Sequence, residues 1–232
     1  QPLVFERLRN SLMLAAVTLV ISVPLAIVLG VVAGLNEGTL VDDAISISAL
    51  SVVGLPEFVT GLILIQIFAF ELNLLPANSS IRPDASFVEA LPKLILPALT
   101  ATLVLLAYVA RLTRSGVIEE LAQPYIRTAT LKGLPYRTVV VKHLLRNALL
   151  PTITVLAISF GWLISGLVVV ENVFNYPGVG RLLVFAINRR DLPLIRAITM
   201  VTVVGFASAN LVADILYGEL NPRIRLGEWG GR

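Results

Sequence analysis

Few residues of this 232-residue chain have side chains that could do chemistry, and they are widely spaced. His143 is the single histidine and cysteine is absent, so the sequence offers neither a metal cluster nor a disulfide framework. A lone histidine can act as a base. An intramembrane enzyme would also need a nucleophile beside a base, or paired acids, at helical spacing, and the apolar segments contain no such pair. We therefore expect no catalytic residue and no metal site on this chain.

Charge is concentrated in one stretch between two apolar segments. Seven Lys and Arg side chains fall between Arg111 and Arg146, together with helix-punctuating Gly and Pro residues. Apolar residues follow at helical spacing, which predicts an amphipathic stripe: Val117, Ile118, Leu121, Ala122, Tyr125, Ile126 and Ala129. A structured, charged stretch inside an apolar protein is where a membrane subunit meets something soluble.

Proline and glycine divide that stretch into helices. Pro124 suits the first position of a helix, so we expect one helix to end near Gln123 and a short one to run from Pro124 to Lys132. Gly133 then fits the position just after the helix, and Pro135 opens the next one. With Arg127 and Lys132 pointing outward, the short helix suits either a groove of a protein partner or acidic lipid headgroups, and the residues alone leave both open.

The elements that position this stretch are membrane spans. The chain is 56% hydrophobic and only 14% charged, with a mean hydropathy of +0.87, whereas a soluble domain carries about 25% charged residues. We expect an all-α membrane protein, since lipid leaves backbone groups no other partner. Five spans of about 20 or more apolar residues are predicted, at about 8–35, 44–70, 91–113, 148–170 and 194–217, with a loop at about 114–147.

The distribution of Lys and Arg predicts the orientation. The basic loop belongs on the cytoplasmic side, which places the N-terminus outside. The net charge of +3 therefore reflects this bias rather than nucleic-acid binding, and we expect no nucleic-acid partner. The loop at 36–43 runs against the rule, because it carries Glu37, Asp42 and Asp43 and no Lys or Arg.

Polar residues near the spans are candidates for a pathway or a gate. Glu57 follows Pro56 inside the second apolar stretch, where the proline can break the helix, and its alternative role is a hydrogen-bonded structural carboxyl. Gln66 and Asn210 have the same two interpretations. The loop at 172–180, with Asn172 and Tyr176, is either a gate at the outer mouth or a turn that returns the chain to the last span. The candidates are Glu57, Gln66, Asn172, Tyr176 and Asn210.

The stretches Tyr125 to Leu134 and His143 to Pro151 are the most specific motifs of the chain. They resemble the coupling-loop signature of permease subunits of bacterial ATP-binding-cassette importers, closest to the dipeptide/oligopeptide/nickel group of the first-subunit type. Arg127-Thr128-Ala129 stands where the general family has Glu-Ala-Ala, and Gly133 stands at its glycine. The loss of the Glu is usual in the peptide group. Further matches are Leu55 to Phe58, Leu96 to Leu99, Glu171 to Gly180 and Asp214 to Arg225.

The resemblance implies the type I importer permease fold with a cytoplasmic coupling helix, in the bacterial or archaeal cytoplasmic membrane. It implies four kinds of partner: a second homologous permease, two ABC ATPases, an extracytoplasmic substrate-binding protein and membrane lipid. ATP and Mg²⁺ would bind the ATPases, with no cofactor on this chain, which has no phosphate-binding loop. The ATPase-contacting residues would be Tyr125, Ile126, Arg127, Thr128, Ala129, Lys132 and Gly133, with Tyr125, Ile126 and Ala129 packing in the ATPase groove. Full-length members carry one more N-terminal span, which this chain is expected to lack.

The leading hypothesis is an ATP-driven peptide importer permease. The same machinery importing nickel, glutathione or oligosaccharides remains open. An ion-coupled secondary transporter would show inverted repeats and several mid-membrane charges. The sequence has no such repeat and chiefly Glu57 as a charge.

Overall fold

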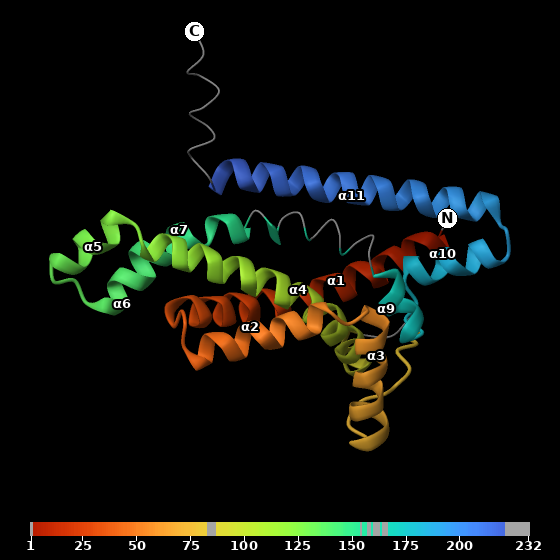
Figure 1. Cartoon of the computed structure of the whole chain (residues 1–232). Helices are drawn as coiled ribbons and strands as arrows, with labels where there is room; N and C mark the ends of the chain where they lie inside the picture. The colour runs from red at the N-terminus through yellow and green to blue at the C-terminus, as the bar shows by residue number, and fades with distance from the viewer. Residues whose placement is uncertain are drawn as a thin grey trace, which may run out of the picture. The chain divides into compact units, whose positions relative to one another are not determined.

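A computed structural model describes residues 2–82, 87–153, 155, 156, 159, 163 and 167–220, and every regular element within these ranges is helical (Figure 1). By backbone contacts the chain divides into two compact units. Unit 1 comprises Gln1–Ser22, Val52–Leu105 and Ser159–Asn210, and unit 2 comprises Val23–Ser51, Leu106–Ile158 and Leu211–Arg232. The long helices α1 (Pro2–Leu35), α4 (Phe87–Leu121) and α11 (Leu192–Leu220) each contribute residues to both units.

Unit 1 combines the first part of α1 with short helices and most of α11. Its short elements are α3 (Glu57–Ile65), the π-helix η1 (Gln66–Glu71), α9 (Val168–Val173) and α10 (Val179–Asn188). Gly61 on α3 makes a close approach possible, because a Cβ atom there would lie 3.2 Å from the Phe174 ring and 3.5 Å from the Thr100 side chain. A buried apolar cluster in this unit joins α1, α10 and α11 through Val4, Val179, Leu182, Ala186 and Ile198.

Unit 2 is built on the ends of α1 and α4. α2 (Leu40–Val53) follows α1, and α5 (Pro124–Leu131), α6 (Tyr136–Thr138), the π-helix η2 (Val139–Leu144) and α7 (Leu145–Ala148) follow α4. Small residues let α1 and α4 pack backbone to backbone. A Cβ atom on Gly30 would lie 2.5 Å from the Ala110 carbonyl oxygen, and one on Gly34 would lie 2.7 Å from Val117.

Two helices of the described chain are long and apolar enough to cross a membrane, Leu3–Leu35 and Val88–Leu121. They correspond to the first and third predicted spans. α4 continues eight residues past 113, so the predicted loop at 114–147 begins as helix.

The helix expected over 44–70 is divided in two in the structure, at the proline that the sequence indicated could break it. The helix is interrupted at residues 54–56, between α2 and α3, where Pro56 takes an extended conformation with φ −57° and ψ 137°. A proline lacks the N–H that would continue α2, which accounts for the break. The two pieces qualify as one span only if the broken pair is counted as one. Nine residues of the predicted span at 148–170 lie outside the described residues, so that span stays a prediction. α11 begins two residues before the predicted fifth span.

Candidate functional site

The short helix predicted in the basic stretch is present as α5, Pro124–Leu131. Gln123 precedes it in an extended conformation, Pro124 occupies its first turn and Lys132 ends it. Gly133 follows with φ +74°, a left-handed conformation that glycine adopts without strain. The helix and its two ends therefore follow directly from the proline and the glycine, one residue shorter than predicted.

The inner face of α5 belongs to the core of the protein. Ile126 and Ala129, each 7% exposed, pack with Val117, Val140 and Leu144 in a buried cluster. Within this chain α4 and η2 cover that face, because a one-sided apolar stripe is buried by the nearest apolar surface. The expected contact of Ile126 and Ala129 with an ATPase groove stays a prediction.

Tyr125 also faces the protein rather than a partner. Its hydroxyl donates a hydrogen bond to the Glu120 carboxylate and accepts one from the Asn147 amide at 3.0 Å. Burial raises the pKa of the Tyr125 hydroxyl, and the adjacent Glu120 carboxylate raises it further. Tyr125 is half-buried and braces α5 against α4 and α7, and its predicted role in packing on the ATPase stays a prediction.

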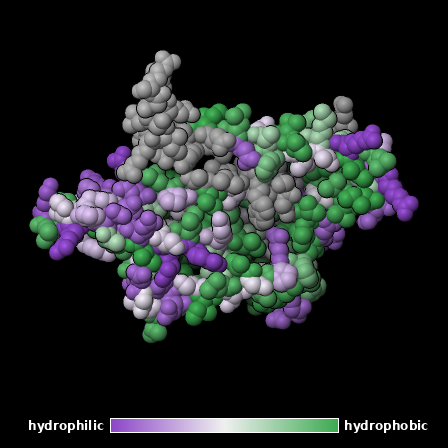
Figure 2. Space-filling view, turned by 45° about the horizontal axis from the view of Figure 1, so that its top comes forward, coloured by the Kyte–Doolittle hydropathy of each residue, from purple (hydrophilic) through white to green (hydrophobic). Residues whose placement is uncertain are grey.

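The outer face of α5 is exposed in unit 2. Arg127, Thr128, Leu131 and Lys132 are exposed, and Leu131 is 80% exposed. We call these four residues the coupling surface. Hydrophilic residues gather over α5 and α6, on the left of the space-filling view, while apolar residues cover much of the rest of the visible face (Figure 2). Leu131 was not singled out from the sequence, although its place opposite Ile126 and Ala129 on the helix was the available signal.

An ion pair between the buried Asp42 and Arg114 ties α2 to α4 in the same unit. The Asp42 carboxylate, 2% exposed, accepts hydrogen bonds from Arg114 Nε at 2.5 Å and from its Nη2 at 2.6 Å. It also accepts the Gly38 N–H at 3.0 Å and the Ser46 hydroxyl at 3.2 Å. Arg114 lies three residues before Val117, which supports α5. The pair was missed in the sequence, because Asp42 and Arg114 are 72 residues apart.

The candidate pathway residues do not form one group. Glu57 is partly buried at the start of α3, where its Oε1 atom has no hydrogen-bond partner among the described residues. Gln66 is exposed and donates a hydrogen bond to the Glu71 carboxylate within η1 at 3.3 Å. Asn172 donates a hydrogen bond to the Val168 carbonyl at 2.7 Å. Asn210 is half-buried on α11. Their transport roles stay predictions.

Tyr176, the remaining candidate, has a clear structural role. Its side chain is fully buried and donates a hydrogen bond to the Asn10 carbonyl at 2.8 Å, which holds the loop at 172–180 against α1. Its role in a gate stays a prediction.

Glu171 is a further polar residue to which the sequence analysis assigned no role of its own. It is 1% exposed at α9 and accepts the Ser11 hydroxyl through Oε1 and the Arg181 N–H through Oε2 at 3.0 Å. A Cβ atom on Gly178 would lie 2.1 Å from Glu171 Oε1, so a larger residue there would displace the carboxylate from the start of α10. Burial raises the pKa of Glu171, against the opposing effect of these hydrogen bonds. The signal available was a carboxylate shortly before two glycines at a helix start.

Within the described residues, no three His, Cys, Asp or Glu side chains come together in a way that could hold a metal ion. The fold and the site together define a helical membrane permease in which the short helix α5 presents an exposed, largely polar face. In keeping with this class, the fold matches a solved structure described as an amino acid ABC transporter with histidines, with a TM-score of 0.70, 15% identity and 94% coverage of each chain.

Residues 26–226 match the family of binding-protein-dependent transport system inner membrane components, and the chain belongs to this family. A probable peptide ABC transporter permease of Sinorhizobium fredii is 36% identical over 96% of this chain and 71% of its own length. The glutathione transport system permease GsiC of Escherichia coli K12 is 37% identical, over 95% of this chain and 69% of its own. The di/tripeptide permease DppB of Pseudomonas aeruginosa is 38% identical, over 84% of this chain and 64% of its own length. The chain is thus a multi-pass membrane permease subunit of an ABC importer, which is a non-catalytic role.

Proposed function

We propose that this permease carries short peptides, and that its coupling surface transmits the state of a cytoplasmic ABC ATPase to the spans. The complete importer would contain a second homologous permease, two ATPases that bind ATP and Mg²⁺, and an extracytoplasmic binding protein. It would work in the cytoplasmic membrane of a bacterium or archaeon. The names of the peptide and di/tripeptide relatives support the substrate class.

The observation that carries the coupling proposal is the division of α5 into two faces. One face is fixed in the core through Ile126 and Ala129, so the helix cannot move without α4 and η2. The other face presents Leu131, 80% exposed, flanked by the exposed cations Arg127 and Lys132. A single apolar anchor inside a ring of polar groups is the pattern of an interface hot spot. A lipid-bound helix would instead expose a broad apolar face.

The coupling surface can be tested by co-purification of the tagged full-length permease in detergent with the other subunits. We expect Leu131→Glu to reduce the recovered ATPases at least tenfold, while the second permease still co-purifies. Val141→Glu is the matched control, because Val141 is 64% exposed on η2, outside the coupling surface. If both variants retain the ATPases equally, the coupling surface is not the ATPase contact.

Glutathione is the second candidate substrate, because the 37% identical permease GsiC is named for its transport. It falls within the same chemical class, since glutathione is itself a tripeptide. Uptake into vesicles that contain the complete importer separates the two. Competition of labelled tri-alanine by excess glutathione indicates a shared route, and its failure assigns the importer to ordinary peptides.

A further inference from the structure

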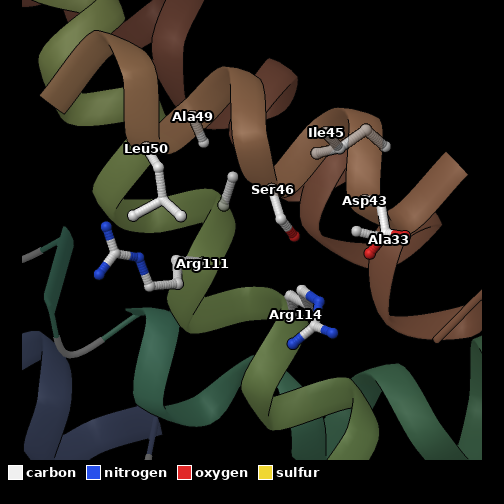
Figure 3. A pocket seen from close by; sticks show the side chains of 9 residues that line it. Ala33, Asp43, Ile45, Ser46, Ala49, Leu50, Arg111 and Arg114 are labelled. Carbon is white, nitrogen blue, oxygen red and sulfur yellow. The ribbon is translucent and has the colours of Figure 1, made fainter. Parts of the chain in front are cut away.

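A cavity of about 310 Å³ lies in unit 2 between α1, α2 and α4, and neither the coupling surface nor the family membership assigns it a role (Figure 3). Its walls are mostly apolar, from Ala33, Ile45, Ala49, Leu50 and Ala110. Its charged lining residues are Asp43, Arg111 and Arg114. The volume is at the lower end of the range for small-molecule sites.

The charges in the cavity are separated by sign. Arg111 is exposed and, among the residues that the structure describes, has no hydrogen-bond or ion-pair partner. It lies beside Leu50, at the end of the cavity away from Asp43 and Ala33 (Figure 3). Arg114 at the other end is already neutralised by its two hydrogen bonds to Asp42.

The Asp43 end carries an excess of negative charge. The carboxylates of Glu37 and Asp43 both act electrostatically on Arg114, in addition to Asp42. Asp42 is hydrogen-bonded to Arg114, and Glu37 and Asp43 act on it through their charge. This arrangement gives a structural reason for the acidic loop at 36–43, which the positive-inside rule does not explain.

We infer that this cavity binds a zwitterionic short peptide, with the peptide carboxylate at Arg111 and its terminal ammonium at Asp43. The inference rests on the proposed function, and it places a substrate contact on this chain. Asp43 and Leu50 are seven residues apart on α2, which corresponds to about 10 Å of helix. An extended tripeptide spans about 10 Å as well. The apolar walls between the two ends accept side chains without discrimination.

The test is equilibrium binding of tri-alanine to the purified transporter complex in detergent, with its binding protein removed, by titration calorimetry. Tri-alanine amide lacks the carboxylate, and N-acetyl-tri-alanine lacks the ammonium. Wild type is expected to bind tri-alanine about tenfold more tightly than either blocked peptide, the scale of a charge-assisted hydrogen bond at a partly exposed site.

Each variant should remove one preference only. Arg111→Gln is expected to bind tri-alanine and its amide equally, while it keeps the preference over the acetylated peptide. Asp43→Asn is expected to bind tri-alanine and N-acetyl-tri-alanine equally, while it keeps the preference over tri-alanine amide. Arg146→Gln, an exposed arginine outside the cavity, is the control and should keep both preferences.

The outcomes separate this inference from the proposed function. If tri-alanine fails to bind, or if neither variant changes the preferences, the cavity is not a peptide site. ATP hydrolysis of the complete complex is measured in parallel, with the binding protein restored. Hydrolysis that peptide stimulates, with no binding in the cavity, leaves the importer intact and overturns the inference alone. Absence of both overturns the peptide function as well.

Discussion

Replacement of Asp42 by alanine removes the acceptor that holds Arg114, the Gly38 N–H and the Ser46 hydroxyl together. The Arg114 side chain is only 28% exposed, so water replaces the lost hydrogen bonds incompletely. Loss of one partner from a buried pair costs about 3–5 kcal/mol. Partial exposure of Arg114 reduces this figure, and we expect a loss of about 2–4 kcal/mol.

That loss corresponds to a fall in the unfolding midpoint of about 5–15 °C, because 1 kcal/mol shifts a chain of this size by about 2–4 °C. Thermal unfolding of the full-length chain in detergent measures it. Asp43→Ala is the matched control, since Asp43 is the exposed neighbouring carboxylate, and its midpoint should fall by less than about 2 °C.

A double-mutant cycle isolates the pair itself. The double variant Asp42→Ala with Arg114→Met should lose at least about 1 kcal/mol less free energy of unfolding than the two single variants lose together, because residues in direct contact couple. Strict additivity, or a single-variant midpoint within 2 °C of wild type, would refute the claim that this ion pair fastens α2 to α4.

Three further predictions concern Gly178, Gly133 and Glu171. Gly178→Ala should lower the unfolding midpoint more than Gly133→Ala in the same scan, because its Cβ would lie 2.1 Å from Glu171 Oε1, whereas open space surrounds Gly133. Gly133→Ala should still lower the free energy of unfolding by about 1–2 kcal/mol, because alanine is strained at φ +74°. Gly133→Asn should lower it less, and chemical denaturation of the two variants ranks them. Because burial raises the pKa of Glu171 above 4.5, the folded state holds a proton that the unfolded state releases, so stability should fall as pH rises from 4.5 through the folded pKa. Glu171→Gln should flatten that dependence, and an unchanged pH profile in this variant would contradict the assignment.

The sequence by itself determined the features that depend on local chain chemistry. Hydropathy over long windows predicted the helices α1 and α4, since backbone groups in lipid can be satisfied only within a helix. Pro124 and Gly133 defined the ends of α5, because proline fixes φ and glycine alone adopts a left-handed turn freely. The motif at 125–134 indicated the family that the comparison with known proteins then showed.

Only the tertiary structure decided which side chains face inward. The amphipathic stripe of α5 has an apolar face whichever surface covers it, and periodicity cannot say whether that surface is α4 or another protein. Here the chain itself covers Ile126 and Ala129, which leaves Leu131 for a partner. Likewise the Asp42–Arg114 and Ser11–Glu171 contacts join residues 72 and 160 positions apart. Such contacts have no local signature, because a buried charge is stabilised by whatever partner the fold brings to it rather than by its neighbours in sequence.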